Sequence, residues 1–230
     1  MIYGIPYASA GLIWKYYGEK LIFNYMNYNP YFCKHTDLTH TILKKIDDTI
    51  ISLVDCEDNG ISSEKHLFSF ISDFLPLWFE RNPDFDKQFY QVLKIVIEVL
   101  EQNIIKNISD VISENILHYN YSNSKYFSNC ILEIPSQTIN WLETVIKINN
   151  SSTSLDIEKI DFVIFPYYDG GWAAQCVPPS LSHKFEQRIP FPKSWAGQTV
   201  KLPELSQVAD ATFCHSGCFF VRAKTKESVI

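Results

Sequence analysis

The sequence lacks a surplus of basic residues, which excludes a broad positive surface for binding the phosphate backbone of nucleic acids. Its 230 residues include 20 Lys and Arg against 26 Asp and Glu, which gives a formal net charge of −6. A metal enzyme that acts on phosphates remains compatible with this charge, because bound cations would supply local positive charge.

Long apolar runs and a secretory signal are also absent. The longest apolar stretch, residues 92–100, is interrupted by Lys94 and Glu98, so it does not predict a membrane span. Met1-Ile-Tyr-Gly is not a basic segment followed by an apolar one. We therefore expect a cytoplasmic protein without a membrane partner, whose six cysteines are reduced: Cys33, Cys56, Cys130, Cys176, Cys214 and Cys218.

Two common catalytic motifs are missing. There is no Gly-x-Ser-x-Gly turn for a serine nucleophile and no Gly-x-x-x-x-Gly-Lys loop to hold phosphates. Aromatic residues, in contrast, reach 15% of the chain. They fit either an aromatic-rich core and surface or a platform on which nucleic-acid bases stack.

Apolar periodicity predicts three helices in the first half of the chain. We expect a helix over residues 8–26 with Ser9 as its cap, and a second helix over 37–54 that ends at an Asn59-Gly60 turn. A long amphipathic helix is expected over residues 84–117. Its apolar stripe needs only a packing neighbour and no ligand.

The second half predicts a mixture of strands and helices. Strands are expected over residues 131–134, 161–167 and 172–177, the last two joined by a hairpin turn at Asp169-Gly-Gly171. A helix over 138–146 and a further strand within 213–223 complete the pattern.

Three blocks of sequence carry a resemblance to a known family. The first, at residues 9–18, reads Ser-Ala-Gly-Leu-Ile-Trp-Lys-Tyr-Tyr-Gly, and the second, at 54–61, reads Val-Asp-Cys-Glu-Asp-Asn-Gly-Ile. The third runs from 161 to 227 and includes Gln175-Cys-Val-Pro178, Phe185-Glu-Gln-Arg188 and Phe213-Cys-His215. Together they resemble the Myg-type (melanocyte-proliferating-gene) metal-dependent hydrolases, relatives of the phosphoesterases named for an Asp-His-His motif.

The resemblance implies hydrolysis of phosphoesters with two divalent cations, Mn²⁺ or Mg²⁺, and plausibly a 3′-5′ exonuclease acting on RNA. The chain contains no Asp-His-His triplet. We expect that the family's N-terminal segment, which supplies most of the metal ligands, is absent. The alternative is an inactive remnant or a non-catalytic binding module, with an N-terminal fragment or a second copy as a partner.

Asp55 and Asp58 are the metal ligands that the resemblance implies in this chain. Their spacing places both on one side of a helix end, where Asp47, Asp48 and Glu57 add further acidity. The competing interpretation is a polar helix end followed by a turn. For His35-Thr-Asp37, a helix cap competes in the same way with a His-x-Asp metal motif.

Substrate contacts are implied at His215, Arg188, Lys224 and Lys226, with solvated charges or local ion pairs as the alternative. Cys214, His215 and Cys218 form a compact set that could suggest zinc. Because residues 214–218 are expected to lie in one strand, the side chains of Cys214 and Cys218 would point to one face of the sheet and that of His215 to the other. Buried cysteines that pack as small apolar residues are the alternative.

The expected fold class is α/β. By resemblance, residues 1–62 would be the remnant of an Asp-His-His-type phosphoesterase domain and 63–124 a helical connector. Residues 125–230 would be a C-terminal substrate-binding domain of the α+β type with a mixed sheet.

Overall fold

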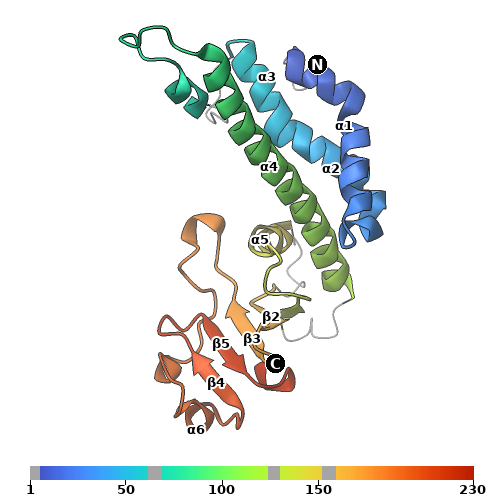
Figure 1. Cartoon of the computed structure of the whole chain (residues 1–230). Helices are drawn as coiled ribbons and strands as arrows, with labels where there is room; N and C mark the ends of the chain where they lie inside the picture. The colour runs from blue at the N-terminus through green and yellow to red at the C-terminus, as the bar shows by residue number, and fades with distance from the viewer. Residues whose placement is uncertain (1–5, 62–68, 124–129, 152–158) are drawn as a thin grey trace. The chain divides into compact units, whose positions relative to one another are not determined.

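The computed structural model describes residues 6–61, 69–123, 130–151 and 159–230. They belong to two compact units, one up to Ile112 and one from Ser113 onward (Figure 1). The mixed sheet and the helices confirm an α/β protein. The finer division at residues 62 and 124 stays a prediction. Among the described residues, none of the helices combines the length and apolar character needed to cross a bilayer.

Unit 1 is helical. Its elements are α1 (Ser9–Tyr28), the short 3₁₀ segment η1 (Phe32–Leu38), α2 (Thr39–Ile46), a π-turn η2 (Asp47–Ile51), α3 (Ser52–Asp58), a second 3₁₀ segment η3 (Ser69–Phe74), and α4 (Phe85–Ser122) as far as Ile112. In Figure 1, α2 and α3 run along α4, and the Thr49 hydroxyl donates to Asn107 Oδ1 between them.

The first helix forms where the sequence predicts it, but its buried face is different. Gly11, Trp14 and Gly18 are buried along with Ile22 and Met26, whereas Ile13 and Tyr17, which belong to the apolar periodicity of this helix, are 62% and 64% exposed. Ser9 is the first helical residue and makes no capping hydrogen bond, so its predicted role as a cap is wrong. Two glycines are buried because neighbouring side chains press against them.

The predicted second helix is a helical run with a π-turn inside it. Ile42, Ile46 and Ile50 are buried at the predicted spacing of four. The extra residue of a π-turn breaks the regular α-helical ladder, a distortion frequent at functional sites. It falls here on Asp47–Ile51.

The long helix is confirmed and extends to Ser122 as α4. Its later part in unit 1 is packed: Ile104, Ile108, Val111 and Ile112 are buried. In its first turns Phe85, Phe89 and Tyr90 are more than 60% exposed, so the predicted stripe is buried only in part.

Unit 2 is built on a five-stranded mixed sheet in the order β1-β2-β3-β5-β4. β1 (Ile131–Glu133) and β2 (Phe162–Pro166) are parallel and are connected through α5 (Leu142–Ser151). β3 (Trp172–Cys176) is antiparallel to β2 and to β5 (Phe220–Ala223), and β4 (Ala211–Cys214) pairs with β5 at the edge. Gly170, at φ +92°, closes the predicted β2–β3 hairpin.

Both faces of the sheet are covered. Val163 and Phe165 face a core with Val145 and Ile148 of α5 and Leu117 of α4. Ile164 faces the opposite core, which includes Leu202 of the short helix α6 (Leu202–Ser206). This arrangement explains the uninterrupted apolar run Phe-Val-Ile-Phe, which is typical of a strand buried on both sides.

Two expectations in unit 2 are wrong. The helix expected at 138–146 lies at 142–151, so it begins later than expected and includes Asn149. The strand expected within 213–223 is two strands, β4 and β5, joined by a turn at His215–Cys218. Cys218 lies in that turn, in the left-handed region at φ +53°.

Residues 178–197 hold only 3₁₀ turns, η5 (Leu181–His183) and η6 (Lys193–Trp195). A third 3₁₀ turn, η7 (Glu227–Val229), follows β5.

Candidate functional site

Three pieces of the third sequence block meet at one end of the sheet in unit 2. Gln175 pairs with Phe220, so the end of β3 lies beside the beginning of β5 and the His215–Cys218 turn. The backbone N–H of Arg188 donates to the carbonyl of Val177, just beyond β3. Strand register therefore gathers residues that are separated by about 40 positions in the chain.

A cavity of about 510 Å³ opens at this end of the sheet. We call it the sheet-end cavity, and it is lined by Ile139–Leu142, Gln175, Cys176, Pro178, Lys184–Gln187, Gly217 and Phe219. Its volume lies in the range of small-molecule sites. The lining combines aromatic rings with amide and charged groups, which suits a ligand that is both flat and polar.

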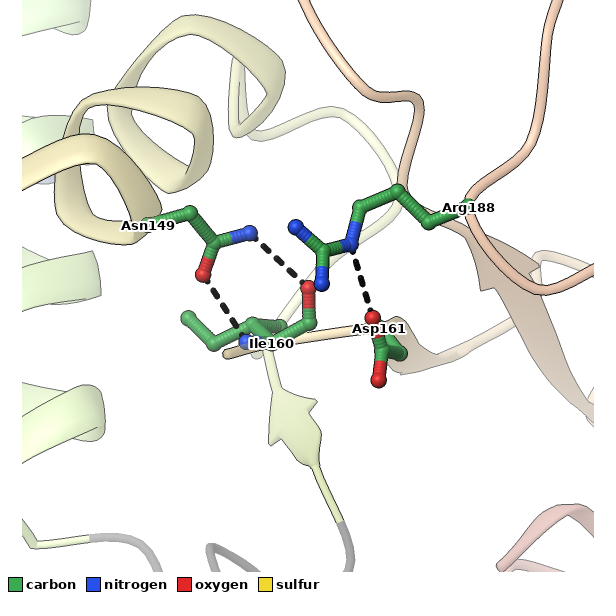
Figure 2. Close-up of polar contacts among 4 residues, drawn as sticks. All are labelled: Asn149, Ile160, Asp161 and Arg188. Carbon is green, nitrogen blue, oxygen red and sulfur yellow. Dashed lines mark hydrogen bonds and ion pairs between the residues drawn. The ribbon is translucent and has the colours of Figure 1, made fainter. Parts of the chain in front are cut away.

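Arg188 is held beside the cavity by a polar network (Figure 2). Its Nε donates to Asp161 Oδ1 at 2.8 Å, and Asp161 is only 7% exposed. Asn149 fixes the preceding residue, because its amide donates to the Ile160 carbonyl and its Oδ1 accepts from the Ile160 N–H. The terminal nitrogens of Arg188 make no hydrogen bond to the residues that the structure describes, so they can donate to an anion.

His215 lies in the turn that borders the sheet-end cavity. Its Nδ1 accepts a hydrogen bond from the Gly217 N–H at 3.0 Å, and its ring lies 4.3 Å from the ring of Phe219. The accepted hydrogen bond assigns the proton of the neutral ring to Nε2. Nε2 of His215 is thus a hydrogen-bond donor at the same end of the sheet as Arg188.

The other two predicted substrate residues lie at the opposite end of the sheet. Lys224 and Lys226 follow β5, whose last residue, Ala223, pairs with Trp172 at the start of β3. The ammonium group of Lys226 forms an ion pair with Glu133 and lies over the Trp172 ring. This geometry favours the local ion pair for Lys226. A substrate role for both lysines stays a prediction.

Burial disfavours a nucleophilic role at neutral pH for Cys176 and Cys214. Burial raises the pKa of Cys176 to about 12 and that of Cys214 to about 11, so both remain thiols. Cys214 and Cys218 are buried, as the apolar alternative predicts. They do not share a strand with His215 between them, because Cys218 lies in the turn.

In unit 1 the first two sequence blocks are joined through Asp55. Its Oδ1 accepts a hydrogen bond from the Gly11 backbone N–H at 2.9 Å, in the first turn of α1. A Cβ at position 11 would overlap the Asp55 carboxylate. Asn59 adds a second link by donating to the Pro6 carbonyl at 2.9 Å. The close approach of the Asp55 carboxylate to the backbone at position 11 explains why the first block has glycine there.

A second cavity, of about 310 Å³, lies between α1 and α2 in unit 1. Asp47 lines it together with Tyr7, Gly11, Trp14, Lys15, Glu19, His40, Leu43 and Lys44. Burial, together with the negative charges of Asp48 and Asp55, raises the pKa of Asp47. Its Oδ1 is buried without a hydrogen-bond partner among the described residues.

The described residues do not fit the two-cation centre that the resemblance implies. Asp55 is 3% exposed and turns its carboxylate to the backbone of α1, whereas Asp58 is exposed at the end of α3. Across 6–61, 69–123, 130–151 and 159–230, no three His, Cys, Asp or Glu side chains are grouped to hold a metal ion.

Sequence reasoning missed the residues whose importance depends on folding. The sequence marks Asp47 only as one of several acids, and Asn149 lies beyond the helix expected at 138–146. Asp161 opens the third block, but its pairing with Arg188 spans 27 positions and has no local signal. His35 and Asp37 both lie within η1, outside any strand, and α2 begins at Thr39 without a side-chain cap, so the predicted cap at Asp37 is wrong.

Comparison with known proteins identifies a family. The model described as Uncharacterised protein family (UPF0160), MYG1_exonuc, matches residues 2–230. A MYG1 protein of Chlamydia trachomatis is 28% identical over 194 residues, 83% of this chain and 63% of the relative. MYG1 proteins of Chlamydia pneumoniae and Dictyostelium discoideum are 27% and 24% identical over 98% of this chain, and 70% and 71% of their own lengths. The chain thus spans less than two thirds of the first relative. No solved structure gives a significant match.

Proposed function

This chain belongs to the MYG1 family (UPF0160). We propose that it acts in metal-dependent phosphoester hydrolysis, as a 3′-5′ exonuclease-like protein on RNA. Unit 2 would be its substrate-binding part. The main support for the proposal is that three pieces of the third sequence block meet at the sheet-end cavity. The name of the matching family model, MYG1_exonuc, supports the reaction class. A cytoplasmic location is part of the same proposal.

Phosphate binding is the step that this chain's own residues support best. Arg188 offers two unpaired terminal nitrogens in a position fixed by Asp161, and His215 offers Nε2 from the neighbouring turn. Both lie at the end of the sheet where Lys184 adds a cation to the cavity wall. Guanidinium groups recognise phosphate oxygens through paired hydrogen bonds.

We expect Arg188→Ala and His215→Ala each to weaken binding of a short single-stranded RNA, by roughly tenfold or more for Arg188, because a charge-assisted contact is lost. Lys224→Ala and Lys226→Ala, at the opposite end of the sheet, test the other two predicted substrate residues. A change of less than about twofold for both, typical of a screened surface charge, would place the site at the sheet-end cavity. Fluorescence anisotropy with a labelled oligoribonucleotide measures this. Equal losses in all four variants would contradict the placement of the site.

Catalysis is a separate question from binding, because the described residues hold no complete group of metal ligands. A Mn²⁺-dependent assay with a 5′-labelled oligoribonucleotide tests it on the full chain. Shortening from the 3′ end that is abolished by Asp58→Ala would support the predicted metal role of Asp58. Binding without shortening would support the second candidate, a non-catalytic binding module that works with an N-terminal fragment or a second copy.

A further inference from the structure

The sheet-end cavity contains an aromatic side chain that has no packing role. Phe185 is 96% exposed although it lines the cavity wall. A phenyl ring exposed to water gains no burial free energy, so its position is not explained by the stability of the fold. Phe219 lines the same cavity, is half-buried, and its ring contacts His215.

Gln175 adds a polar group to the same cavity. Its position in β3 is fixed by pairing with Val163 and Phe220, and its carboxamide makes no hydrogen bond to the described part of the chain. A carboxamide offers a donor beside an acceptor. Nucleobase edges offer the complementary pair, and the amide can rotate to match any of the four bases.

From these observations we propose that the sheet-end cavity binds one base of a single-stranded RNA, stacked on Phe185 and Phe219 with its edge against Gln175. The proposal rests on the RNA substrate of the proposed function and adds the contacts that hold it. Stacking on an aromatic ring tolerates every base. The cavity therefore selects for the presence of a base, and Arg188 and His215 would hold the adjacent phosphate.

Calorimetric titration of the full chain with AMP, UMP and ribose 5-phosphate separates base binding from phosphate binding. We expect AMP and UMP to bind with affinities within about tenfold of each other, and ribose 5-phosphate to bind at least about tenfold more weakly, because it lacks the stacked base.

Phe185→Ala should weaken AMP binding by roughly fivefold to a hundredfold, the range of stacking on one aromatic ring. It should leave the fold intact, because the ring is almost fully exposed. The matched control is Tyr168→Ala, another aromatic that is 76% exposed, which lies in the hairpin turn at the opposite end of the sheet. We expect no change in AMP binding for this control.

Equal affinity for ribose 5-phosphate and AMP would overturn the base pocket and leave a phosphate site. Normal AMP binding by the Phe185 variant would also overturn it. If the chain binds an oligoribonucleotide but none of the mononucleotides, the base pocket fails and the proposed function stands. If it binds neither, both fail.

Discussion

Replacing Asp55 with Ala is expected to destabilise unit 1 by about 2 to 4 kcal/mol, because a buried hydrogen-bond acceptor and its side-chain volume are both lost. The Gly11 N–H in the first turn of α1 would lose its partner. In a unit of this size the loss corresponds to a fall in Tm of roughly 10 to 25 °C. Hydrogen exchange of α1 and α3 peptides, with and without the substitution, locates the effect.

Two further variants separate a structural role for Asp55 from a role as metal ligand. Asp55→Asn keeps an oxygen acceptor for Gly11 and should cost much less than Ala. Asp58→Ala, at an exposed position, should change stability by less than about 0.5 kcal/mol. An Asp55→Ala chain that keeps its stability but loses a Mn²⁺-dependent rise in Tm would contradict the structural role.

Asn149→Ala is expected to destabilise unit 2 by about 3 kcal/mol. The side chain satisfies both backbone groups of Ile160, a residue with no exposed surface, so its removal leaves a buried donor and a buried acceptor unpaired. The change should also make the segment that precedes β2 less ordered, and Asp161 in that segment holds Arg188 by an ion pair. We therefore expect weaker RNA binding as the temperature approaches the lowered Tm.

Asn150→Ala is the matched control, because Asn150 lies next to Asn149 on α5 but is exposed. Alanine favours helix more than asparagine does, so this variant should be neutral or slightly stabilising. Near-ultraviolet circular dichroism melts of the two variants give the comparison. Similar melts would show that the pairing with Ile160 contributes little.

Local patterns predicted the elements whose signal lies within one stretch of sequence. The long helix has an apolar stripe over many turns, and the β2–β3 hairpin has a turn with two glycines between two apolar runs. The buried face of α1 could not be read in this way. Gly11 and Gly18 have no side chain to signal burial, and they are buried because Asp55 and Trp14 approach them.

The candidate site was predictable in its residues but not in its geometry. Arg188 and His215 were predicted from the third sequence block, and the structure places them at one end of the sheet. Lys224 and Lys226 were predicted with them, yet they lie at the other end. The distinction depends on the pairing of β5 with β3, which places Phe220 beside Gln175 and Ala223 beside Trp172 and has no local signal in the sequence.

The most direct test of the sheet-end cavity as the RNA site is photo-crosslinking of the full chain to a short single-stranded RNA with a terminal 4-thiouridine. Mass spectrometry then identifies the crosslinked peptides. The cavity predicts crosslinks within residues 184–187 and 217–219, which line it. Crosslinks confined to the segment around Lys224 and Lys226, at RNA concentrations where the chain is saturated, would contradict it.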